Sequence, residues 1–383
     1  MMEEKTIFFD GRFLSPGHAG IGRYSSELLK NLLLIDKNNK YILLISPGTT
    51  FDPELSSAIK KSEKPVEIVE FEAKHYSYKE QFALLKLINE ITPDLVHFPH
   101  FSHPIFYKGK FVVTIHDLTL SKYAERSNPI KNFAYKTVIS RAARNSAVII
   151  TDSEFTKKEL TKQFQLPASK IAVTYLGIDS KFQKITNPKS LEKAAQYGLL
   201  KPYILYVGQW RSHKNLLRLV EAFNLLLSKN QNLRGKIELV FAGRVDPKYP
   251  ELAQLIKKLK MQNDVRFTDF VKDEDLPIIY NDALVFAFPS LSEGFGLPAL
   301  EAQACGVPVV SSDKTCMPEI LGRGAIYCNP VSVDDIMIKL ERIISDPELR
   351  KELVKEGFLN SKKFSWEDAA QKTLEVYSSL LYK

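Results

Sequence analysis

The sequence has little of what marks secreted, membrane-spanning or repetitive proteins. It holds three cysteines in 383 residues, Cys305, Cys316 and Cys328, with no Cys-x-x-Cys pair, so we expect reduced thiols in a cytosolic protein. Its longest uncharged apolar run, residues 283–288, is far shorter than the roughly 18 residues that a membrane-spanning helix needs. The first residues lack a basic region followed by an apolar stretch, so no signal peptide is expected. We find no short internal repeat and no low-complexity tract.

Charge of one sign does not dominate either. The 53 basic and 45 acidic residues give a net charge of +8, each half of the chain carries +4, and no basic tail is present. Such an even excess favours anionic ligands or an anionic membrane surface. Nucleic acid is not expected as a partner.

Strand-like apolar runs alternate with helix-period stretches along the chain. This alternation predicts α/β domains with parallel sheets covered on both faces. The pattern weakens at about 180–200, a polar stretch with Pro188, and restarts at Tyr203. We therefore expect two doubly wound domains, 1–183 and 184–364, that bind ligands at the carboxyl ends of their strands, facing one interdomain cleft.

The segment 288–310 carries the strongest functional pattern. A buried strand ends at Pro289, Gly294 and Gly296 make a turn, and Pro298 suits the first turn of a helix. The start of such a helix holds anions such as a diphosphate. Glu293 and Glu301 can face the same site, where a carboxylate accepts two hydrogen bonds from a vicinal diol. The alternative is one glutamate favoured by the helix dipole and one solvated in the loop.

A second pattern follows the strand that ends at Gly208. Arg211 and Lys214 lie in the loop before a helix that starts near Asn215. Positive charge at this place can neutralise a leaving phosphate, although a solvated basic loop would look the same.

Two further segments follow strands of the first domain. Gly17, Gly20 and Gly22 spell Gly-x-x-Gly-x-Gly ahead of a helix; they match neither the dinucleotide nor the P-loop fingerprint, but would let a ligand approach the backbone. The pair His116-Asp117 ends another strand and is placed to hydrogen-bond a substrate. A structural histidine with satisfied partners is the alternative.

Two motifs suggest metals but are not expected to bind them. His97, His100 and His103 recur at every third position, but Pro99 breaks helical geometry and no carboxylate or thiol is close. Asp273 and Asp275 spell Asp-x-Asp just ahead of a helix, where they fit helix capping better. We therefore predict no metal site.

The stretch 122–145 is basic and amphipathic. Six basic residues stand against one acid, Glu125, and the apolar side chains recur at helical spacing. We expect them to face the core, leaving a solvated basic face; docking on anionic lipid is the alternative reading. The basic and then the apolar residues are Lys122, Arg126, Lys131, Lys136, Arg141, Arg144, Ile130, Phe133, Ala134, Val138 and Ala142.

Taken in order, these motifs resemble glycosyltransferase family 4, whose members are retaining enzymes of the GT-B fold. The landmarks are Gly20-Ile-Gly-Arg-Tyr24, Pro99-His-Phe101, Thr114-Ile-His-Asp117, Thr174-Tyr-Leu-Gly-Ile-Asp179, Tyr206-Val-Gly208 with Lys214-Asn215, Phe241-Ala-Gly243, the Glu293–Glu301 spacing and Phe364-Ser-Trp366. The resemblance is greatest to mannosyltransferase-like enzymes that build bacterial surface polysaccharides. It implies that the final helix, 365–383, packs back onto the first domain. One departure is Gln209, where many members have Arg; Arg211 is expected to supply that charge.

The resemblance also implies the roles of the site residues. Glu293, His116, Lys214 and Arg211 would be catalytic, and Glu301 would bind the ribose hydroxyls of a nucleotide-diphosphate sugar. The acceptor would approach from the first domain. The remaining donor-binding residues would be Gly20, Gly22, Gly208, Gly294, Phe295, Gly296, Leu297 and Val271, and the acceptor-side residues Arg23, Tyr24, His100 and Asp117.

The function implied is transfer of a hexose, mannose first, to a glycan or lipid-linked glycan with retention of configuration and without a metal or other cofactor. GDP-mannose is the first expected donor and a UDP-sugar the second. A nucleotide-sugar epimerase of the same two-domain fold is the alternative, and a non-enzymatic scaffold at a membrane surface is a second one. The expected location is the cytoplasm, with peripheral contact to the membrane possible.

Overall fold

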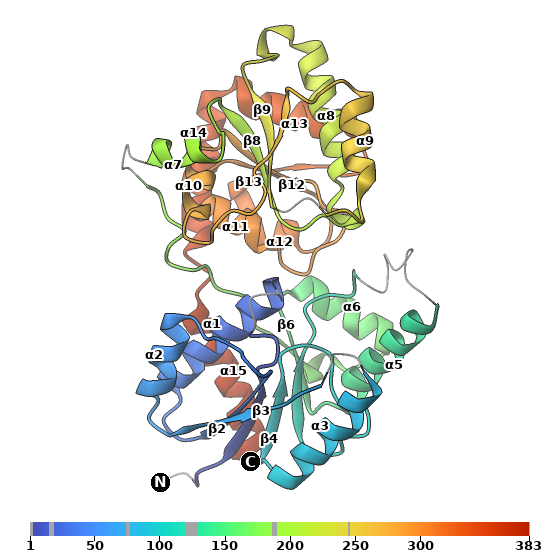
Figure 1. Ribbon diagram of the computed structural model, residues 1–383, viewed down its shortest axis with the longest axis vertical. Coiled ribbons are helices and arrows are strands. Elements are labelled where there is room, and N and C mark those ends of the chain that lie inside the picture. The colour runs from blue at the N-terminus through green and yellow to red at the C-terminus, as the bar shows by residue number, and fades with distance from the viewer. Residues whose placement is uncertain are drawn as a thin grey trace. The chain divides into compact units, whose positions relative to one another are not determined.

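The structure, a computed structural model, describes residues 3–14, 19–73, 77–119, 129–185, 190–243 and 246–382 (Figure 1). They form two compact units. The first comprises Met1–Gly177 and Ser365–Lys383, and the second Ile178–Phe364. The chain thus leaves the first unit before the expected boundary at residue 183, and the C-terminal helix belongs to the first unit.

The first unit is built on a seven-stranded parallel sheet in the order β3-β2-β1-β4-β5-β6-β7. Most of these strands are almost wholly buried, as expected for a parallel sheet covered on both faces. The two edge strands are less buried: Glu67, Ile68 and Glu70 of β3 are exposed to solvent, and only Ile171 of β7 is fully buried. The strands are β1 Thr6–Asp10, β2 Lys40–Ile45, β3 Val66–Glu70, β4 Leu95–Phe98, β5 Phe111–Thr114, β6 Val148–Thr151 and β7 Ile171–Val173.

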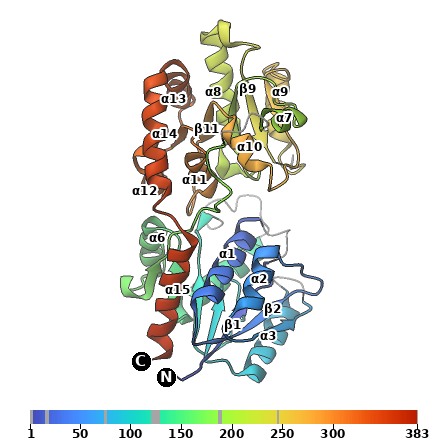
Figure 2. The same cartoon turned by 90° about the vertical axis from the view of Figure 1, so that its left-hand side faces the viewer.

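Helices cover both faces of this sheet. Helix α1 packs against α2 and α15 on one face (Figure 2), and α3, α5 and α6 share a core with the other face. Because side chains alternate along a strand, Phe8 joins the core under α3 and α5 while Phe9 lies against His97, towards α15. The helices are α1 Ala19–Ile35, α2 Pro53–Lys61, α3 Tyr78–Ile91, α5 Pro129–Asn145, α6 Glu154–Phe164 and α15 Trp366–Leu381.

The second unit is built on a six-stranded parallel sheet in the order β10-β9-β8-β11-β12-β13. The last strand, β13, lies at one edge of this sheet. Its sequence, Ala-Ile-Tyr-Cys, is short and half-buried at the sheet edge, so it lacks the apolar run that announces a central strand. The strands are β8 Tyr203–Val207, β9 Glu238–Ala242, β10 Val265–Phe267, β11 Val285–Phe288, β12 Val309–Ser312 and β13 Ala325–Cys328.

Two helical layers enclose this second sheet. Helix α8 packs against α9 and α13, while α11 packs against α10, α12 and α14. Side-chain caps start several helices: Ser332 accepts from the Asp335 N–H for α13, and Asp346 from the Leu349 N–H for α14. The helices are α7 Ser190–Gln196, α8 Leu216–Lys229, α9 Pro250–Lys258, α10 Leu276–Asn281, α11 Leu297–Ala304, α12 Met317–Leu321, α13 Val333–Ser345 and α14 Pro347–Ser361.

Helix α5 departs from the expectation that its apolar stripe faces the core. Ile130 is 73% and Phe133 74% exposed, and Ala134 is exposed as well. The core contacts come from the second half of the helix, through Ile139, Ala142 and Ala143. The predicted orientation was therefore wrong for the first turns, because only the C-terminal half of α5 reaches the sheet. Lys122, Glu125 and Arg126 lie outside the described residues.

Within the part of the chain that the structure describes, no helix is long and apolar enough to cross a membrane.

Candidate functional site

The strongest cluster of predicted residues lies in the second unit, where β8 and β11 run side by side and end at the same edge. Lys214 closes a short 3-10 turn, Ser212–Lys214, after β8, and Glu293 lies in the loop after β11. The Lys214 ammonium donates to both carboxylate oxygens of Glu293, at 2.7 and 2.8 Å. Both side chains keep some exposure, 18% and 10%, so the pair is not sealed inside the core.

A set of hydrogen bonds fixes the two loops against each other. Asn215 adopts a left-handed conformation (φ 64°), and its side-chain amide donates to the carbonyls of Pro289 at 2.9 Å and Pro330 at 2.6 Å. The Leu291 N–H donates to the His213 carbonyl at 2.7 Å. Lys214 and Glu293 are therefore held in register by the backbone on either side of them.

Helix α11 starts directly beside this ion pair. Gly296 precedes it with φ 93°, a conformation that L-residues with a side chain rarely adopt. A Cβ at this position would come within 2.8 Å of Met317 Cε. Phe295 is buried against Phe364, and Leu297 is half-buried. The positive end of the helix dipole therefore lies next to Lys214 and Glu293.

Glu301 lies within α11 and is only 3% exposed. The Tyr280 hydroxyl donates to its Oε2 at 3.0 Å. Burial, reinforced by the charge of Glu301, raises the pKa of the Cys305 thiol, so this cysteine stays protonated at neutral pH. The expected ribose-binding carboxylate is thus held by a tyrosine from α10 that the sequence analysis did not identify.

Arg211 has different partners from Lys214. Its guanidinium donates to Asp246 at 3.1 Å and more weakly to the Gln209 side chain at 3.4 Å. It also lies 6.0 Å from the centre of the Tyr249 ring. The Arg211 side chain is 43% exposed, and surface pairs of this kind contribute little free energy, so a ligand could redirect it.

Two more predicted donor residues lie in neighbouring loops of this unit. Gly208 has φ 145°, and a Cβ there would meet the Tyr206 hydroxyl at 3.0 Å. Val271 is half-buried in the segment between β10 and α10.

The first unit brings another predicted residue, His116, against an unforeseen partner. His116 Nδ1 lies 2.7 Å from Asp152 Oδ2, and its Nε2 lies 3.1 Å from the Pro99 carbonyl oxygen. Both partners are acceptors, so both ring nitrogens must carry protons for the two bonds to form. Burial alone would lower the pKa of His116, but Asp152 overcomes this and raises it. The geometry and the charge therefore favour an imidazolium.

A buried polar chain continues from this histidine towards the C-terminal helix. Tyr24 stacks edge-on against His116, with ring centroids 4.6 Å apart, and its hydroxyl lies 2.9 Å from Thr114 Oγ1. The same Thr114 oxygen lies 2.9 Å from His97 Nε2, and His97 Nδ1 lies 2.5 Å from the Tyr377 hydroxyl. Burial, with a contribution from His116, lowers the pKa of His97 to about 3. His97 is a neutral structural residue.

Gly20 and Gly22, which were expected ahead of a helix, lie inside α1. The helix begins at Ala19, so Gly20 and Gly22 form its first turn, where backbone N–H groups lack helical acceptors. Gly20 faces open space. Arg23 follows in the same turn and is half-buried. Gly17 lies outside the described residues.

The other two acceptor-side residues are placed around β4 and β5. His100 is buried between Phe13 and Phe101, and its Nδ1 accepts from the Ser102 N–H at 3.3 Å. Asp117 is half-buried and accepts from the Thr119 N–H at 2.8 Å.

The motifs that resembled metal ligands have structural partners. His103 stacks on Phe111, Asp273 pairs with Lys181, and Asp275 pairs with Lys193 at 2.7 Å. Tyr197 also donates to Asp275 at 2.8 Å. Among the described residues, no group of three or more His, Cys, Asp or Glu could hold a metal ion.

Sequence comparison assigns the chain to a family. Residues 20–182 match the description "Glycosyltransferase Family 4", and residues 191–359 match "Glycosyl transferases group 1". The O-antigen chain mannosyltransferase B of Escherichia coli is 30% identical over 94% of this chain and 96% of that protein. The chain belongs to glycosyltransferase family 4.

Solved structures confirm the GT-B fold of this transferase. Sucrose-phosphate synthase of Thermosynechococcus elongatus superimposes with a TM-score of 0.79 at 19% identity, covering 99% of each chain. The Anabaena protein HepE, solved with UDP-glucose, superimposes with a TM-score of 0.75 at 18% identity, covering 98% of this chain and all of the other. The prediction of two Rossmann-like domains is thereby confirmed.

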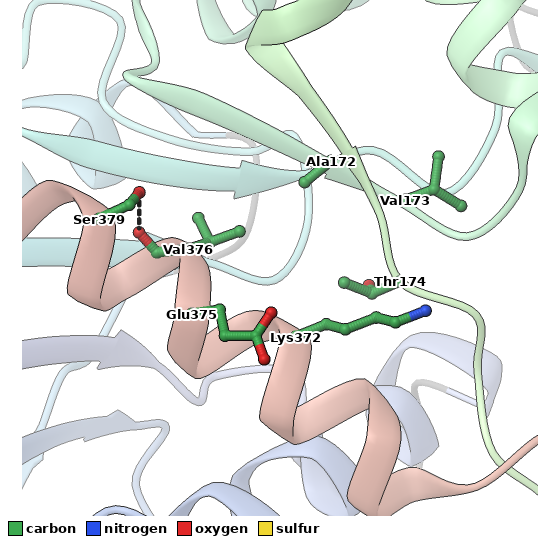
Figure 3. Close-up of a pocket in the computed structure, with 7 residues that line it drawn as sticks. All are labelled: Ala172, Val173, Thr174, Lys372, Glu375, Val376 and Ser379. Atoms are coloured by element: carbon green, nitrogen blue, oxygen red, sulfur yellow. Dashed lines mark hydrogen bonds between the residues drawn. The ribbon is translucent and has the colours of Figure 1, made fainter.

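A pocket of about 390 Å³ lies in the first unit of the glycosyltransferase, between β7 and α15 (Figure 3). None of the predicted site residues lines it. Lys372 there lies over the Tyr175 ring at 5.7 Å, and Ser379 donates to the Val376 carbonyl at 2.8 Å. The predicted site residues therefore lie at the strand ends and not in this pocket.

Sequence reasoning missed Asp152, Tyr280 and Asp246 as partners of predicted residues. Only Asp152 had a usable signal: it directly follows β6, which pairs with the strand that His116 follows. Tyr280 and Asp246 come from a helix and a loop whose approach to Glu301 and Arg211 depends on tertiary packing.

Proposed function

We propose that this glycosyltransferase transfers a mannosyl residue from a nucleotide-diphosphate sugar to a hydroxyl of a glycan or lipid-linked glycan, with retention of configuration. Two observations support the proposal together. The relative that matches the chain over nearly its whole length is named an O-antigen chain mannosyltransferase. The bidentate Lys214–Glu293 pair lies beside the N-terminus of α11, where a diphosphate and its sugar would find charge of both signs.

The donor would bind at the carboxyl edge of the second sheet. An ammonium carries three N–H donors, and two of those of Lys214 go to Glu293, which leaves one for a phosphate oxygen. Glu301 would accept hydrogen bonds from the ribose hydroxyls, and Glu293 would contact the sugar. The loops with Gly208, Val271 and 294–297 would enclose the nucleotide and diphosphate.

The chemistry requires stabilisation of a leaving phosphate. The bond from the anomeric carbon to the phosphate oxygen breaks as the acceptor hydroxyl attacks from the same face, and the proton of that hydroxyl passes to the departing phosphate. Lys214 and the α11 dipole meet the charge that develops there, and such electrostatic stabilisation is usually the main source of an enzyme's rate enhancement. Arg211 would join them by exchanging Asp246 for the phosphate. No metal or other cofactor is part of this proposal.

The acceptor would bind at the edge of the first sheet. His116, held as an imidazolium by Asp152 and the Pro99 carbonyl, supplies a fixed positive charge there. Arg23 and Asp117 supply further polar groups, while Tyr24 and His100 shape the surface.

We propose GDP-mannose as the preferred donor and a UDP-sugar as the second choice. The mannosyltransferase relative favours the first, and the Anabaena structure with UDP-glucose shows that this fold accommodates the second. We place the enzyme in the cytoplasm with peripheral membrane contact and without a nucleic-acid partner. The family consists of transferases, so the epimerase alternative gains no support.

The decisive experiment is a transfer assay with a panel of GDP- and UDP-sugars and a mannan oligosaccharide acceptor. We expect a mannosylated product with GDP-mannose, and an α-linkage in its NMR spectrum because the donor is α-linked. A β-linked product would contradict retention. An isomerised donor without acceptor would favour the epimerase, and turnover only with UDP-sugars would overturn the mannosyl assignment.

A further inference from the structure

We propose that the first unit docks on an anionic phospholipid surface through one face formed by α3, the segment 99–110 and α5. We call this the docking face and define its apolar part by Tyr78, Phe82, Phe106, Ile130 and Phe133. The inference goes beyond the proposed transfer reaction, because it rests on this surface and not on the site residues.

The apolar side chains of the docking face are more than half exposed to solvent. Tyr78 is 87%, Phe82 62%, Phe106 54%, Ile130 73% and Phe133 74% exposed. Single exposed apolar residues are common on soluble proteins, but a group of them on neighbouring elements marks a binding surface.

Contacts between the three elements show that α3, the segment 99–110 and α5 are neighbours in the fold. Tyr78 and Phe82 are four residues apart on α3, and Ile130 and Phe133 are three apart on α5, so each pair shares a helix side. Gln81, next to Phe82, donates to the His103 carbonyl at 3.1 Å.

Two further contacts connect the segment 99–110 to α3 and to α5. The Ile105 N–H donates to Gln81 at 2.9 Å, which places Phe106 beside α3. The rings of Phe101 and Tyr135 lie 5.0 Å apart, which joins the loop to α5.

The charge of the three elements is strongly positive. Together they contain eight basic residues and two acidic ones. Glu80 is buried against Arg12 at 2.5 Å, and Glu90 pairs with Lys86 at 3.7 Å, so neither presents an uncompensated negative charge. The basic residues are Lys79, Lys86, Lys108, Lys110, Lys131, Lys136, Arg141 and Arg144.

This combination fits an anionic bilayer surface better than a protein partner. Aromatic rings partition into the interface between headgroups and acyl chains. Lysine and arginine near that surface each add about 1 kcal/mol of attraction to anionic lipid. On α5, Ile130 and Phe133 supply apolar contact, and the exposed Lys136 and Arg141 of the same helix supply charge.

The test is flotation of the full chain with vesicles of phosphatidylcholine, with and without phosphatidylglycerol. We expect binding that requires phosphatidylglycerol and weakens with salt. Phe82→Ser with Phe133→Ser should lower the partition coefficient at least tenfold. Lys136→Gln with Arg141→Gln should lower it by about 30-fold, from about 1 kcal/mol per charge.

Variants of exposed leucines and lysines on the second unit serve as controls for the removal of apolar side chains and of positive charges. Leu200 and Leu359 are 79% and 53% exposed, and Lys229 and Lys355 are exposed on α8 and α14. Leu200→Ser with Leu359→Ser, and Lys229→Gln with Lys355→Gln, should float like the unaltered protein. All variants should melt cooperatively and retain transfer to a soluble acceptor.

Two results would overturn the inference. One is no binding of the unaltered protein to phosphatidylglycerol vesicles at low salt. The other is equal binding by the docking-face and control variants. A concentration-dependent dimer that Phe133→Ser abolishes, without vesicle binding, would assign the face to a second copy of the chain instead. Since flotation does not measure transfer, these outcomes would contradict the proposed membrane contact but leave the proposed transfer reaction untouched.

Discussion

At the scale of single residues, the structure turns separate sequence signals into charge pairs. Lys214 and Glu293 lie 79 positions apart in the sequence, yet the lysine donates to both carboxylate oxygens of the glutamate. The pair is partly exposed, and the proposed function brings the donor's phosphate to it. A residue poised in this way should act mainly on the step in which the phosphate gains charge.

Removing Lys214 should therefore affect turnover more than donor binding. Interactions that strengthen in the transition state raise kcat, and loss of one such electrostatic donor costs on the order of 10²–10³ in rate. We expect a Lys214→Ala variant to show a loss of this size in single-turnover transfer while binding donor measurably. Lys229→Ala, an exposed lysine on α8, is the control. Near-normal turnover of Lys214→Ala would refute the placement of the diphosphate.

Glu301 should behave in the opposite way. Glu301→Gln still accepts a hydrogen bond from Tyr280, so the fold around it should survive, but the charged acceptor for the ribose is lost. A hydrogen bond to a charged group contributes about 1.5–3 kcal/mol, so calorimetry should show weaker donor binding by that amount. Glu293→Gln should chiefly lower turnover. Equal effects of both variants on affinity alone would contradict this division.

His116 and Asp152 predict a dependence of stability on pH. The pKa of His116 is raised, so the folded protein holds this proton more tightly than the unfolded chain, whose histidine pKa is about 6.5. The pair therefore stabilises fully below about pH 6.5, and its contribution disappears as pH rises through the folded pKa. Burial also raises the pKa of Asp152, although the charge of His116 opposes this rise. A raised pKa of Asp152 likewise lowers the free energy of unfolding as pH increases.

The groups facing His116 are Asp152 and Asp117, with the Pro99 carbonyl, Tyr24 and neutral His97 around them. Asp152→Asn removes the charge that holds the proton. Its deficit in unfolding free energy should be largest below pH 6.5 and shrink at higher pH. Denaturant titrations at several pH values measure this deficit. NMR titration of the Asp152→Asn variant should show a lowered pKa of His116, whose signal is assigned by its loss in His116→Gln. A deficit independent of pH would contradict an imidazolium.

At the scale of elements, the sequence predicts those features that local pattern determines. The buried strands, the turn at Gly294–Gly296 and the start of α11 near Pro298 were expected from apolar runs, glycines and proline, and the structure has them. The outward face of α5 was not predictable, since its apolar spacing fits a buried stripe equally well. Which side of a helix meets the sheet depends on where its neighbours end.

The C-terminal helix shows how one small residue can position an element. A Cβ on Gly177 would lie 2.1 Å from the Trp366 nitrogen and 2.6 Å from the Ser365 carbonyl carbon. Both are backbone atoms at the start of α15, so no side chain can swing aside. The segment Thr174–Asp179 therefore needs a glycine at position 177, because the backbone at the start of α15 packs directly against it.

Gly177→Ala should accordingly destabilise the first unit. Overpacking of a rigid contact costs about 1–3 kcal/mol and occasionally more, and we expect a fall of several degrees in Tm by calorimetry. Gly20→Ala is the matched control, because a Cβ at Gly20 meets nothing within 4 Å and alanine favours the helix. An unchanged Tm for Gly177→Ala would show that α15 does not depend on this contact.

At the scale of the whole molecule, two sheets of the same kind each bring predicted site residues together at the carboxyl ends of neighbouring strands. Lys214 and Glu293 follow β8 and β11, and His116 and Asp152 follow β5 and β6. The alternation of strands and helices predicted this arrangement, because parallel strands all end at one edge. The partners Tyr280 of Glu301 and Asp246 of Arg211 were not predictable, since they come from a helix and a loop whose approach depends on the completed sheet.

The last prediction concerns how the whole enzyme handles phosphate charge. In the proposed donor site, Lys214, Arg211 and the positive end of the α11 dipole supply positive charge. Asp273 and Asp275, the carboxylates that resemble a metal motif, are already paired with Lys181 and Lys193. Transfer by the full chain should therefore persist in EDTA at an unchanged rate, measured with purified donor and acceptor. Asp273→Asn should leave the rate unchanged as well, because that carboxylate only pairs with a lysine. Full loss of activity on chelation, restored by Mg²⁺ or Mn²⁺, would mean that a divalent cation and not Lys214 meets the leaving phosphate.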